Sequence, residues 1–315
     1  MRDVDCVGAL VRDAHHRVFT QRRTPTRRIL PGVWDIVGGH LDPGETPEQA
    51  LAREIEEETG WRLRRIEAVL ADWEWEYDGR VRRELDYLVE VDGDLDAPVL
   101  APREHDAYAW IGPDDLDLLM ENRDDDDRAL RDLVAKAVRT RLTARLRLEP
   151  IGPEHAEDLR RVLDDRTIAE HDPRSDAGEI RRHALRVRTG WESDRVHEWI
   201  AYDRSSGEPV GRGGLSYRDL DGERRLRLGW AIPAGSPDGY AVEIGRAGLA
   251  YAFEDLAAEE VVALVASGDR RSPGVTERTV VERLGMEYDR DVVLDGESCS
   301  CYRSRQSTRN SAKPS

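Results

Sequence analysis

Four glutamates crowd onto about one helical turn of the sequence: Glu54, Glu56, Glu57 and Glu58. Glu54 lies three residues before Glu57 and four before Glu58, so in a helix these three carboxylates project from one side. Like charges at these spacings cost about 0.2–0.5 kcal/mol per pair, and one neighbouring arginine, Arg53, cannot balance them all. A hard divalent cation can, because carboxylate oxygens are the ligands that Mg²⁺ or Mn²⁺ prefers. The pattern predicts a metal site, although a solvated, glutamate-rich helix would show the same run.

The helix that must position these glutamates has clear start and stop signals. Thr46 suits the N-cap, Pro47 suits the first helical position, and Gln49 completes a capping box with Thr46. Gly60 suits the left-handed conformation that ends a helix. These signals predict a helix over residues 47–59, directly behind a glycine-rich loop.

The motif around the glutamates is longer than the helix. Gly39, Glu45 and residues 53–61 fit the pattern G-x₅-E-x₇-R-E-U-x-E-E-x-G-U at every position, where U is a bulky apolar residue. With this motif, residues 3–140 resemble a Nudix hydrolase. The resemblance implies an α/β/α sandwich, and the short predicted strands around the helix fit that fold.

The resemblance also implies roles for the matching positions. The metal ligands would be Glu54, Glu57, Glu58 and the carbonyl of Gly39, while Arg53 would orient a glutamate by hydrogen bonds. Water activated by Mg²⁺ or Mn²⁺ would attack a phosphorus of a nucleoside diphosphate linked to another group. An acidic protein could then handle a pyrophosphate through its metal ions.

Residues outside the motif bear on catalysis and on substrate choice. Many Nudix hydrolases take a further glutamate from a distant loop as metal ligand or base, and Glu104 stands where that residue often lies; a solvated loop glutamate is the alternative.

Trp73, Trp75 and Tyr77 alternate along a predicted hairpin strand and could stack on a base, although such a face is more often core. The proline that usually marks ADP-ribose substrates is replaced, because Trp75 and Glu76 stand there. We therefore expect a nucleoside triphosphate.

The second half of the chain contains a strand, a turn and a helix within "LGWAIPAGSPDGYAVEIGRAGLAYAFEDL". A helix N-terminus near glycine suits a pyrophosphate, although an ordinary strand–turn–helix would look the same. Together with "VGRGGL" and a late "ERLGM", the order of elements over residues 143–303 resembles a GNAT acetyltransferase of the ribosomal-protein-acetylating branch. By that resemblance, backbone N–H groups of Gly239, Tyr240 and Ala241 would hold the pyrophosphate of acetyl-CoA. The acceptor would be an amine, on a small molecule or at a protein N-terminus.

The second half also departs from the GNAT pattern. The position before the glycine is usually basic, but here it is Asp238. The Asn and Ser commonly found before the "LGM" segment are replaced by Gly274 and Glu277. We nominate no catalytic base or acid there, because His197 is better explained as a structural or surface histidine.

Composition limits the class of protein. With 315 residues, 39% of them hydrophobic and 36% charged, the chain suits two globular domains. A net charge of −17 disfavours a nucleic-acid polymer as partner. No apolar run of about 20 residues or signal-peptide core occurs, so we expect no membrane contact and a cytoplasmic location. The three cysteines are expected to be reduced thiols: Cys6, Cys299 and Cys301.

The hydrophobic pattern resets near residue 143. We expect a two-domain α/β protein, with a Nudix α/β/α sandwich over 1–142 and a GNAT-like mixed α/β sheet over 143–303. Residues 304–315 are expected to form a disordered tail. The alternative function is a binding or regulatory protein that senses a nucleotide or CoA without turnover.

Overall fold

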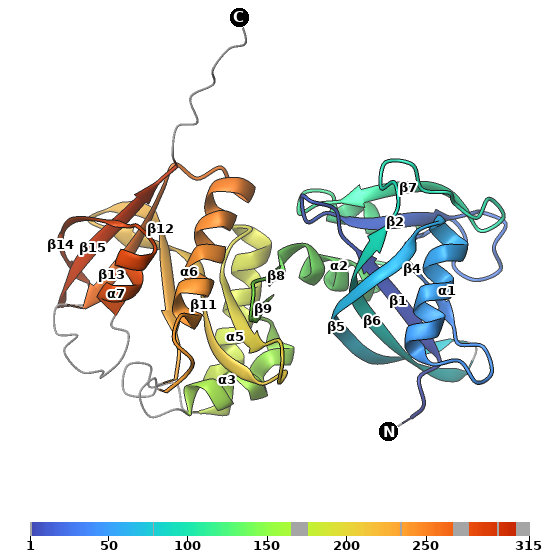
Figure 1. Ribbon diagram of the computed structural model, residues 1–315, viewed down its shortest axis with the longest axis horizontal. Coiled ribbons are helices and arrows are strands. Elements are labelled where there is room, and N and C mark those ends of the chain that lie inside the picture. The colour runs from blue at the N-terminus through green and yellow to red at the C-terminus, as the bar shows by residue number, and fades with distance from the viewer. Residues whose placement is uncertain are drawn as a thin grey trace, which may run out of the picture. The chain divides into compact units, whose positions relative to one another are not determined.

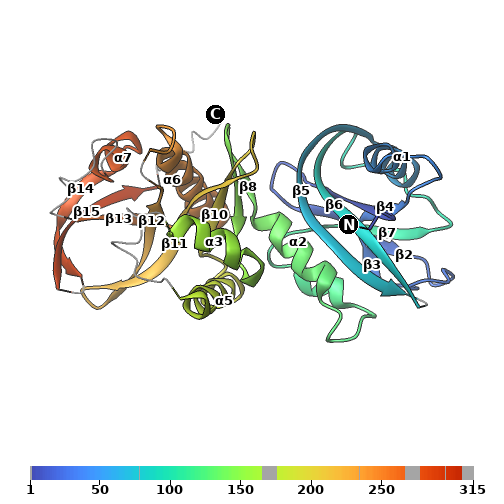
Figure 2. The same ribbon diagram turned by 90° about the horizontal axis from the view of Figure 1, so that it is seen from below.

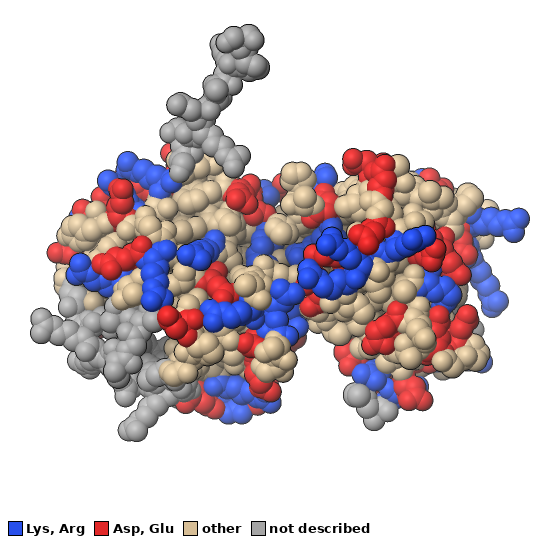
Figure 3. Space-filling model, in the orientation of Figure 1, with Lys and Arg blue, Asp and Glu red and all other residues tan. Residues whose placement is uncertain are grey.

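The computed structural model describes residues 2–77, 79–164, 176–233, 235–266, 277–294 and 296–306. The chain forms two compact units, Met1–Arg139 and Thr140–Ser315 (Figure 1). On the face drawn in Figure 3, Lys and Arg side chains are interspersed with Asp and Glu side chains. Among the described helices, none has the length and apolar character needed to cross a membrane.

The first unit is built from two small sheets and two α-helices. Its strands are β1 Cys6–Val11, β2 Val18–Arg23, β3 Trp34–Asp35, β4 Val37–His40, β5 Arg62–Tyr77, β6 Arg80–Asp92 and β7 His105–Ile111. Its helices are α1 Pro47–Thr59, the 3₁₀ helix η1 Leu116–Met120 and α2 Ala129–Arg139. One sheet has the strand order β4-β1-β6-β5 and the other β3-β2-β7. The predicted hairpin is confirmed, because β5 and β6 pair antiparallel along their length.

The four-stranded sheet lies between α1 and α2 (Figures 1 and 2). Alternate residues of β1, such as Val7 and Ala9, point toward α1 and pack in one buried cluster with Leu51 and Ile55 of that helix. Ile55 is fully buried, and burying such a side chain contributes about 1.5–3 kcal/mol. This packing fixes the side of α1 that faces the sheet, and so the side that its glutamates occupy.

Helix α1 has the ends predicted from the sequence. The side chain of Thr46 accepts a hydrogen bond from the backbone N–H of Gln49, and the Gln49 side chain accepts one from the backbone N–H of Thr46. Gly60 ends the helix with φ 72°, in the left-handed region that favours glycine. The prediction of a helix over residues 47–59 is confirmed.

The second unit is one mixed sheet with helices on both faces. Its strands are β8 Arg141–Leu142, β9 Leu146–Pro150, β10 Glu198–Asp203, β11 Pro209–Leu220, β12 Glu223–Ala231, β13 Glu260–Ala266, β14 Glu287–Leu294 and β15 Glu297–Arg305. Its helices are η2 Pro153–His155, α3 Ala156–Leu163, α5 Ala177–Ser193, α6 Tyr240–Ala250, the π-helix η3 Tyr251–Asp255 and α7 Glu277–Arg283. Helices α6 and α7 lie on one face of the sheet, and α3 and α5 lie on the other (Figure 2).

The sheet of the second unit contains one short parallel pairing. Its strand order is β14-β15-β13-β12-β11-β10-β9-β8. The third and fourth strands in this order, β13 and β12, are parallel and are joined in register at only two positions, Arg227 with Val262 and Leu228 with Ala263. Since β12 continues to Ala231, its last residues lie beyond this pairing within the described strands.

Two stretches differ from the expected domain limits. Arg141 and Leu142, expected in the first domain, pair with β9 of the second unit. Ser304 and Arg305, expected in a disordered tail, pair with Val261 and Glu260 of β13. The sequence of this last segment is polar, so its pairing depends on a strand about 40 residues earlier in the chain rather than on a hydrophobic pattern of its own. Residues 307–315, and Gly274 of the GNAT comparison, lie outside the described residues.

Candidate functional site

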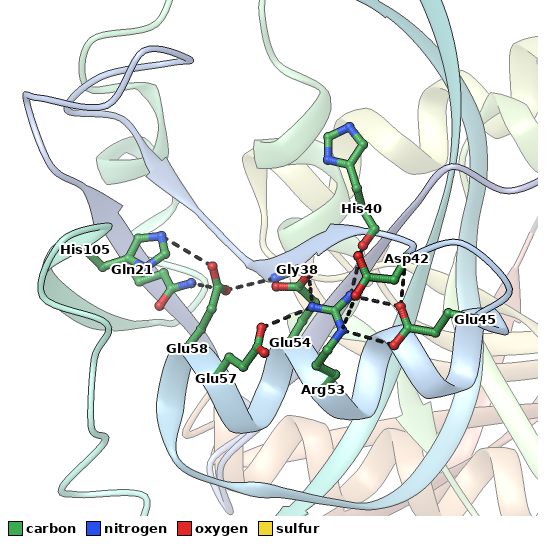
Figure 4. Close-up of polar contacts among 10 residues, drawn as sticks. All are labelled: Gln21, Gly38, His40, Asp42, Glu45, Arg53, Glu54, Glu57, Glu58 and His105. Atoms are coloured by element: carbon green, nitrogen blue, oxygen red, sulfur yellow. Dashed lines mark hydrogen bonds and ion pairs between the residues drawn. The ribbon is translucent and has the colours of Figure 1, made fainter.

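Arg53 lies at the centre of the carboxylates on and around α1 (Figure 4). Its Nε and one terminal nitrogen each donate to Glu45 at 3.0 Å, which makes a two-pronged ion pair. Its other terminal nitrogen donates to Glu54 at 2.8 Å and to Glu57 at 3.1 Å. The pairing with Glu45 is the main reason that the pKa of Arg53 is raised. One guanidinium therefore hydrogen-bonds to three of the motif glutamates.

Glu54 lies directly against the backbone of β4. A Cβ atom added to Gly39 would lie 2.2 Å from Glu54 Oε1, so a residue larger than glycine would displace the carboxylate. Burial raises the pKa of Glu54, and the charges of Glu57 and Glu104 raise it further against the opposing effect of Arg53. The structure thus brings Gly39, Glu54 and Glu104 into one neighbourhood, although they come from three different segments.

Glu58 is the buried member of the set, with 7% of its surface exposed. It accepts hydrogen bonds from Gln21 Nε2 at 2.5 Å and from the backbone N–H of Gly38 at 3.1 Å. Burial nevertheless raises its pKa to about 8, and the nearby charge of Glu54 adds to the effect. A carboxylate in this position is stabilised by any cation that enters the site.

His105 is a neutral neighbour of Glu58. Its Nε2 lies 3.9 Å from Glu58 Oε1, and burial, followed by the charges of Arg23 and Arg27, lowers its pKa to about 4. An uncharged imidazole at this distance leaves the charge of Glu58 unbalanced. Sequence reasoning missed both Gln21 and His105, which lie on β2 and β7 of the structure.

The remaining predicted ligands are more exposed. Glu57 turns toward Arg53 and has 60% of its side-chain surface exposed. Glu104 makes an ion pair with Arg27 at 3.0 Å. In the part of the chain that the structure describes, no three His, Cys, Asp or Glu side chains converge as a preformed metal cage. The candidate ligands therefore share one side of α1 and its surroundings, but each is oriented by its own protein partner.

These residues suit a divalent cation. Glu54 and Glu58 are carboxylates whose charged forms burial disfavours, and the Gly39 backbone lies in contact with one of them. An all-oxygen donor set with excess negative charge matches the chemistry of Mg²⁺ or Mn²⁺. A cation held there would neutralise charge on a phosphate and lower the pKa of a bound water.

The two tryptophans of β5 have polar partners. Trp73 Nε1 donates to Asp86 Oδ2 at 2.7 Å, and Trp75 Nε1 donates to Glu84 Oε2 at 2.6 Å. Arg82 lies over the ring of Trp75, 5.2 Å from its centroid. Both tryptophans are half-buried, and the side chain of Tyr77 lies outside the described residues. The expected aromatic face is thus joined to two carboxyl groups that sequence reasoning did not single out.

In the second unit, α6 begins at an uncapped turn. Gly239 is its N-cap with φ 94°, and no side chain hydrogen-bonds to the cap. The Tyr240 side chain is buried and its hydroxyl donates to Asp203, so its backbone is anchored. The first N–H groups of such a helix, with the positive end of its dipole, suit an anion. Gly239, Tyr240 and Ala241 lie together at this turn.

Two arginines that are distant in the sequence contact Asp238, the position before Gly239 where a basic residue is usual. Arg145 of the segment before β9 donates to the backbone carbonyl of Asp238 at 3.0 Å. Arg283, at the end of α7, makes an ion pair with the Asp238 side chain at 3.0 Å. Two guanidinium groups therefore flank the start of α6, although the sequence position itself holds a carboxylate. No local signal could have revealed them.

Comparison with known proteins finds a matching family model for each half of the chain. The family model for the NUDIX domain matches residues 3–133, and that for the acetyltransferase (GNAT) domain matches residues 145–287. The expected fold class, a Nudix α/β/α sandwich followed by a GNAT-like mixed sheet, is confirmed.

Three curated relatives illustrate the similarity. The nucleoside triphosphatase NudI of Klebsiella pneumoniae (strain 342) is 33% identical over 125 residues, covering 37% of this chain and 86% of that protein. The RNA pyrophosphohydrolase of Erythrobacter litoralis (strain HTCC2594) is 28% identical over 142 residues, covering 38% and 82%. The octanoyltransferase of Myxococcus xanthus is 37% identical over 117 residues, but the chain spans only 30% of its length. The chain therefore belongs to the Nudix hydrolase family through its first half and carries a GNAT acetyltransferase domain in its second.

Proposed function

We propose that the first domain, residues 1–142, hydrolyses a nucleoside triphosphate with Mg²⁺ or Mn²⁺, breaking one P–O bond of the triphosphate and releasing a nucleotide. In this proposal the metal ligands are Glu54, Glu57, Glu58 and the carbonyl of Gly39. Arg53 orients the glutamates, and Glu104 acts as a further ligand or base. The single observation that carries the proposal is Glu58, a buried carboxylate with a raised pKa that, among the described residues, forms no ion pair with Lys or Arg.

The choice of a free nucleotide rests on charge and on the relatives. One relative is named a nucleoside triphosphatase and another an RNA pyrophosphohydrolase. A chain with a net charge of −17 repels a polyanion such as RNA more strongly than it repels a single nucleotide. This difference favours nucleoside triphosphates as the substrate class.

The test is a panel of nucleoside triphosphates and other nucleoside diphosphate derivatives, incubated with the full chain and Mg²⁺. We expect turnover of at least one triphosphate that stops when EDTA is added and resumes with excess Mg²⁺. Chromatography of the products identifies the bond that is broken. Binding of nucleotides without any turnover would instead support the alternative of a sensor protein.

For the second domain, residues 143–303, we propose transfer of an acetyl group from acetyl-CoA to an amine. The amine nitrogen would form a bond to the thioester carbonyl, the C–S bond would break, and the proton of the amine would leave with CoA as the thiol. Support comes from the uncapped start of α6, where Gly239, Tyr240 and Ala241 would bind the pyrophosphate. Calorimetry of the full chain with acetyl-CoA tests this, and absence of binding would count against it.

A further inference from the structure

Two carboxyl groups of β6 have no part in the metal site. Leu85 and Tyr87 point toward α1, where they pack in the buried cluster of that face. Because successive side chains of a strand alternate, Glu84 and Asp86 point to the opposite face of the sheet. Glu84 is the register partner of Trp73 on β5, so the carboxyl groups and the tryptophans share this face.

Asp86 is held in a fully buried position. Its side chain has 0% exposure, and Oδ2 accepts the indole hydrogen bond of Trp73. Its Oδ1 is buried and has no hydrogen-bond partner of fixed donor type among the described residues. A Cβ atom added to Gly8 would lie 2.2 Å from this oxygen, so the carboxyl group rests directly on the backbone of β1. A buried oxygen of this kind requires a proton donor.

The donor available is Glu84 in its protonated form. Burial, followed by the negative charges of Asp86 and Asp35, raises the pKa of Glu84 to about 9. Burial also raises the pKa of Asp86, to about 7, and a hydrogen bond from Glu84 opposes that rise. The pair therefore shares a proton, which lies in the hydrogen bond between the two carboxyl groups.

Glu84 is the accessible member of the pair. It is half-buried, whereas Asp86 is enclosed. With one oxygen joined to Asp86 through the shared proton and the other accepting from Trp75, the Glu84 carboxyl group presents acceptor lone pairs, and no donor, to the outside. The half-buried indole of Trp73, and the face of Trp75 that Arg82 does not cover, lie beside it and provide flat surface for a planar ring.

A single nucleotide could span the distance between the Glu84–Asp86 pair and the proposed metal site. Strand β6 lies two strands from the edge strand β4, a distance of about 9–10 Å across the sheet. Gly38 of β4 donates to Glu58 and is the register partner of Gly8, on which Asp86 rests. A nucleotide with its phosphates at the β4 edge would bring its base to this face.

We propose that Trp73, Trp75 and Glu84 bind the base of the nucleotide and select bases that carry an exocyclic amino group, with Asp86 as the residue that positions Glu84. The inference rests on the proposed function for the identity of the ligand. The amino group would donate a hydrogen bond to Glu84, whereas a keto oxygen at the same place would face acceptor lone pairs. A site built to bind an N–H group rejects an analogue that lacks it.

The test compares nucleoside monophosphates that differ by this group, without any need for hydrolysis. Calorimetry of the full chain would measure CMP against UMP, AMP against IMP, and GMP against IMP. We expect the amino member of at least one pair to bind about tenfold more tightly, a difference near 1.4 kcal/mol. Equal binding within every pair, or no detectable binding of any monophosphate, would overturn the proposal.

Glu84→Gln is the sharpest variant. A glutamine amide directs one N–H at Asp86 and a second N–H outward, so it replaces an acceptor by a donor. The preference for the amino base should disappear or reverse, while the Glu90→Gln control, on the same strand and face, should keep it. Retention of the preference in folded Glu84→Gln would refute the assignment. If that variant does not fold, Trp75→Phe removes the indole donor to Glu84 and should weaken the preference; an unchanged preference would equally refute it.

The experiments distinguish failure of the base-binding proposal from failure of the hydrolase proposal. If the chain hydrolyses triphosphates but shows no amino-group preference, the base subsite is wrong and the hydrolase proposal stands. If the preference exists and Glu84→Gln abolishes it while no triphosphate is turned over, the subsite stands and the hydrolase proposal fails.

Discussion

Buried carboxylates are treated differently in the two units. In the first unit Glu58 is buried and Glu84 half-buried against neutral donors, and burial raises their pKa to about 8 and about 9. In the second unit Glu198 is also partly buried, but Arg212 and His183 outweigh the cost of burial and lower its pKa to about 2. Asp255 is an exception there, since burial raises its pKa even though Arg141 binds it. The contrast separates carboxylates that a protein cation already neutralises from those available to a metal ion or a ligand.

The two kinds of carboxylate therefore have different roles in the protein. A partly buried ion pair such as Glu198 with Arg212 contributes to the architecture of the sheet, and removing one partner leaves an uncompensated charge. A buried acid without a cation costs free energy in the ligand-free protein and recovers it when a ligand binds. Four predictions test this division.

The largest effect is expected for Glu57→Gln. The change keeps the shape of the side chain and removes one charge from the proposed metal site, so hydrolysis should fall by about two orders of magnitude or more while the fold survives. Steady-state assays at saturating Mg²⁺, with circular dichroism for the fold, provide the measurement. Glu56→Gln, at the exposed neighbouring position, is the control and should keep its activity. Turnover of Glu57→Gln near that of the wild type would remove the metal assignment.

The second prediction concerns Glu198 and pH. Because its pKa is lowered from 4.5 to about 2, Glu198 stabilises the folded state above pH 4.5, and this contribution is lost as the pH falls toward 2. Glu198→Gln should therefore lower the free energy of unfolding by about 3 kcal/mol at pH 7 and by much less near pH 2. Urea unfolding monitored by tryptophan fluorescence measures both values, with exposed Glu192→Gln as control. Equal destabilisation at the two pH values would show that Glu198 is not held ionised by its neighbours.

The third prediction concerns the cations at the start of α6. Arg283 is proposed to offset Asp238 near the pyrophosphate, so Arg283→Ala should weaken acetyl-CoA binding about tenfold at low salt. Asp238→Asn should tighten binding by a smaller factor, because it frees Arg283 for the ligand. Calorimetry at low and high salt measures both variants. Unchanged affinity in both would mean that this turn does not face the phosphates.

The smallest effect is expected from separating the units. Fragments 1–139 and 140–315 should each fold, because each unit has its own sheet and core. Hydrolysis by the first fragment should match that of the full chain, and acetyl-CoA binding should remain with the second. A folded but inactive first fragment would show that its site needs residues of the second unit.

The sequence by itself determined the parts of the molecule that depend on local interactions. Helix α1 could be predicted from Thr46 to Gly60, because caps and turn conformations involve residues only a few positions apart. The motif glutamates could be predicted in the same way, since spacing along one helix decides which side chains share a side. Burial of particular carboxyl groups could not be predicted, because it depends on which distant segments of the chain cover them.

Only the tertiary structure decided the partners that set the chemistry of these residues. Gln21 reaches Glu58 across 37 positions of sequence, and Arg283 reaches Asp238 across 45. Glu84 and Asp86 look like ordinary strand residues until β5 and β1 enclose them. Sheet register brings such groups together, and it follows from the pairing of distant strands rather than from any short stretch of sequence. For this reason the glutamate motif and the tryptophans of the proposed base-binding face were readable from the sequence, while Glu84 and Asp86 were not.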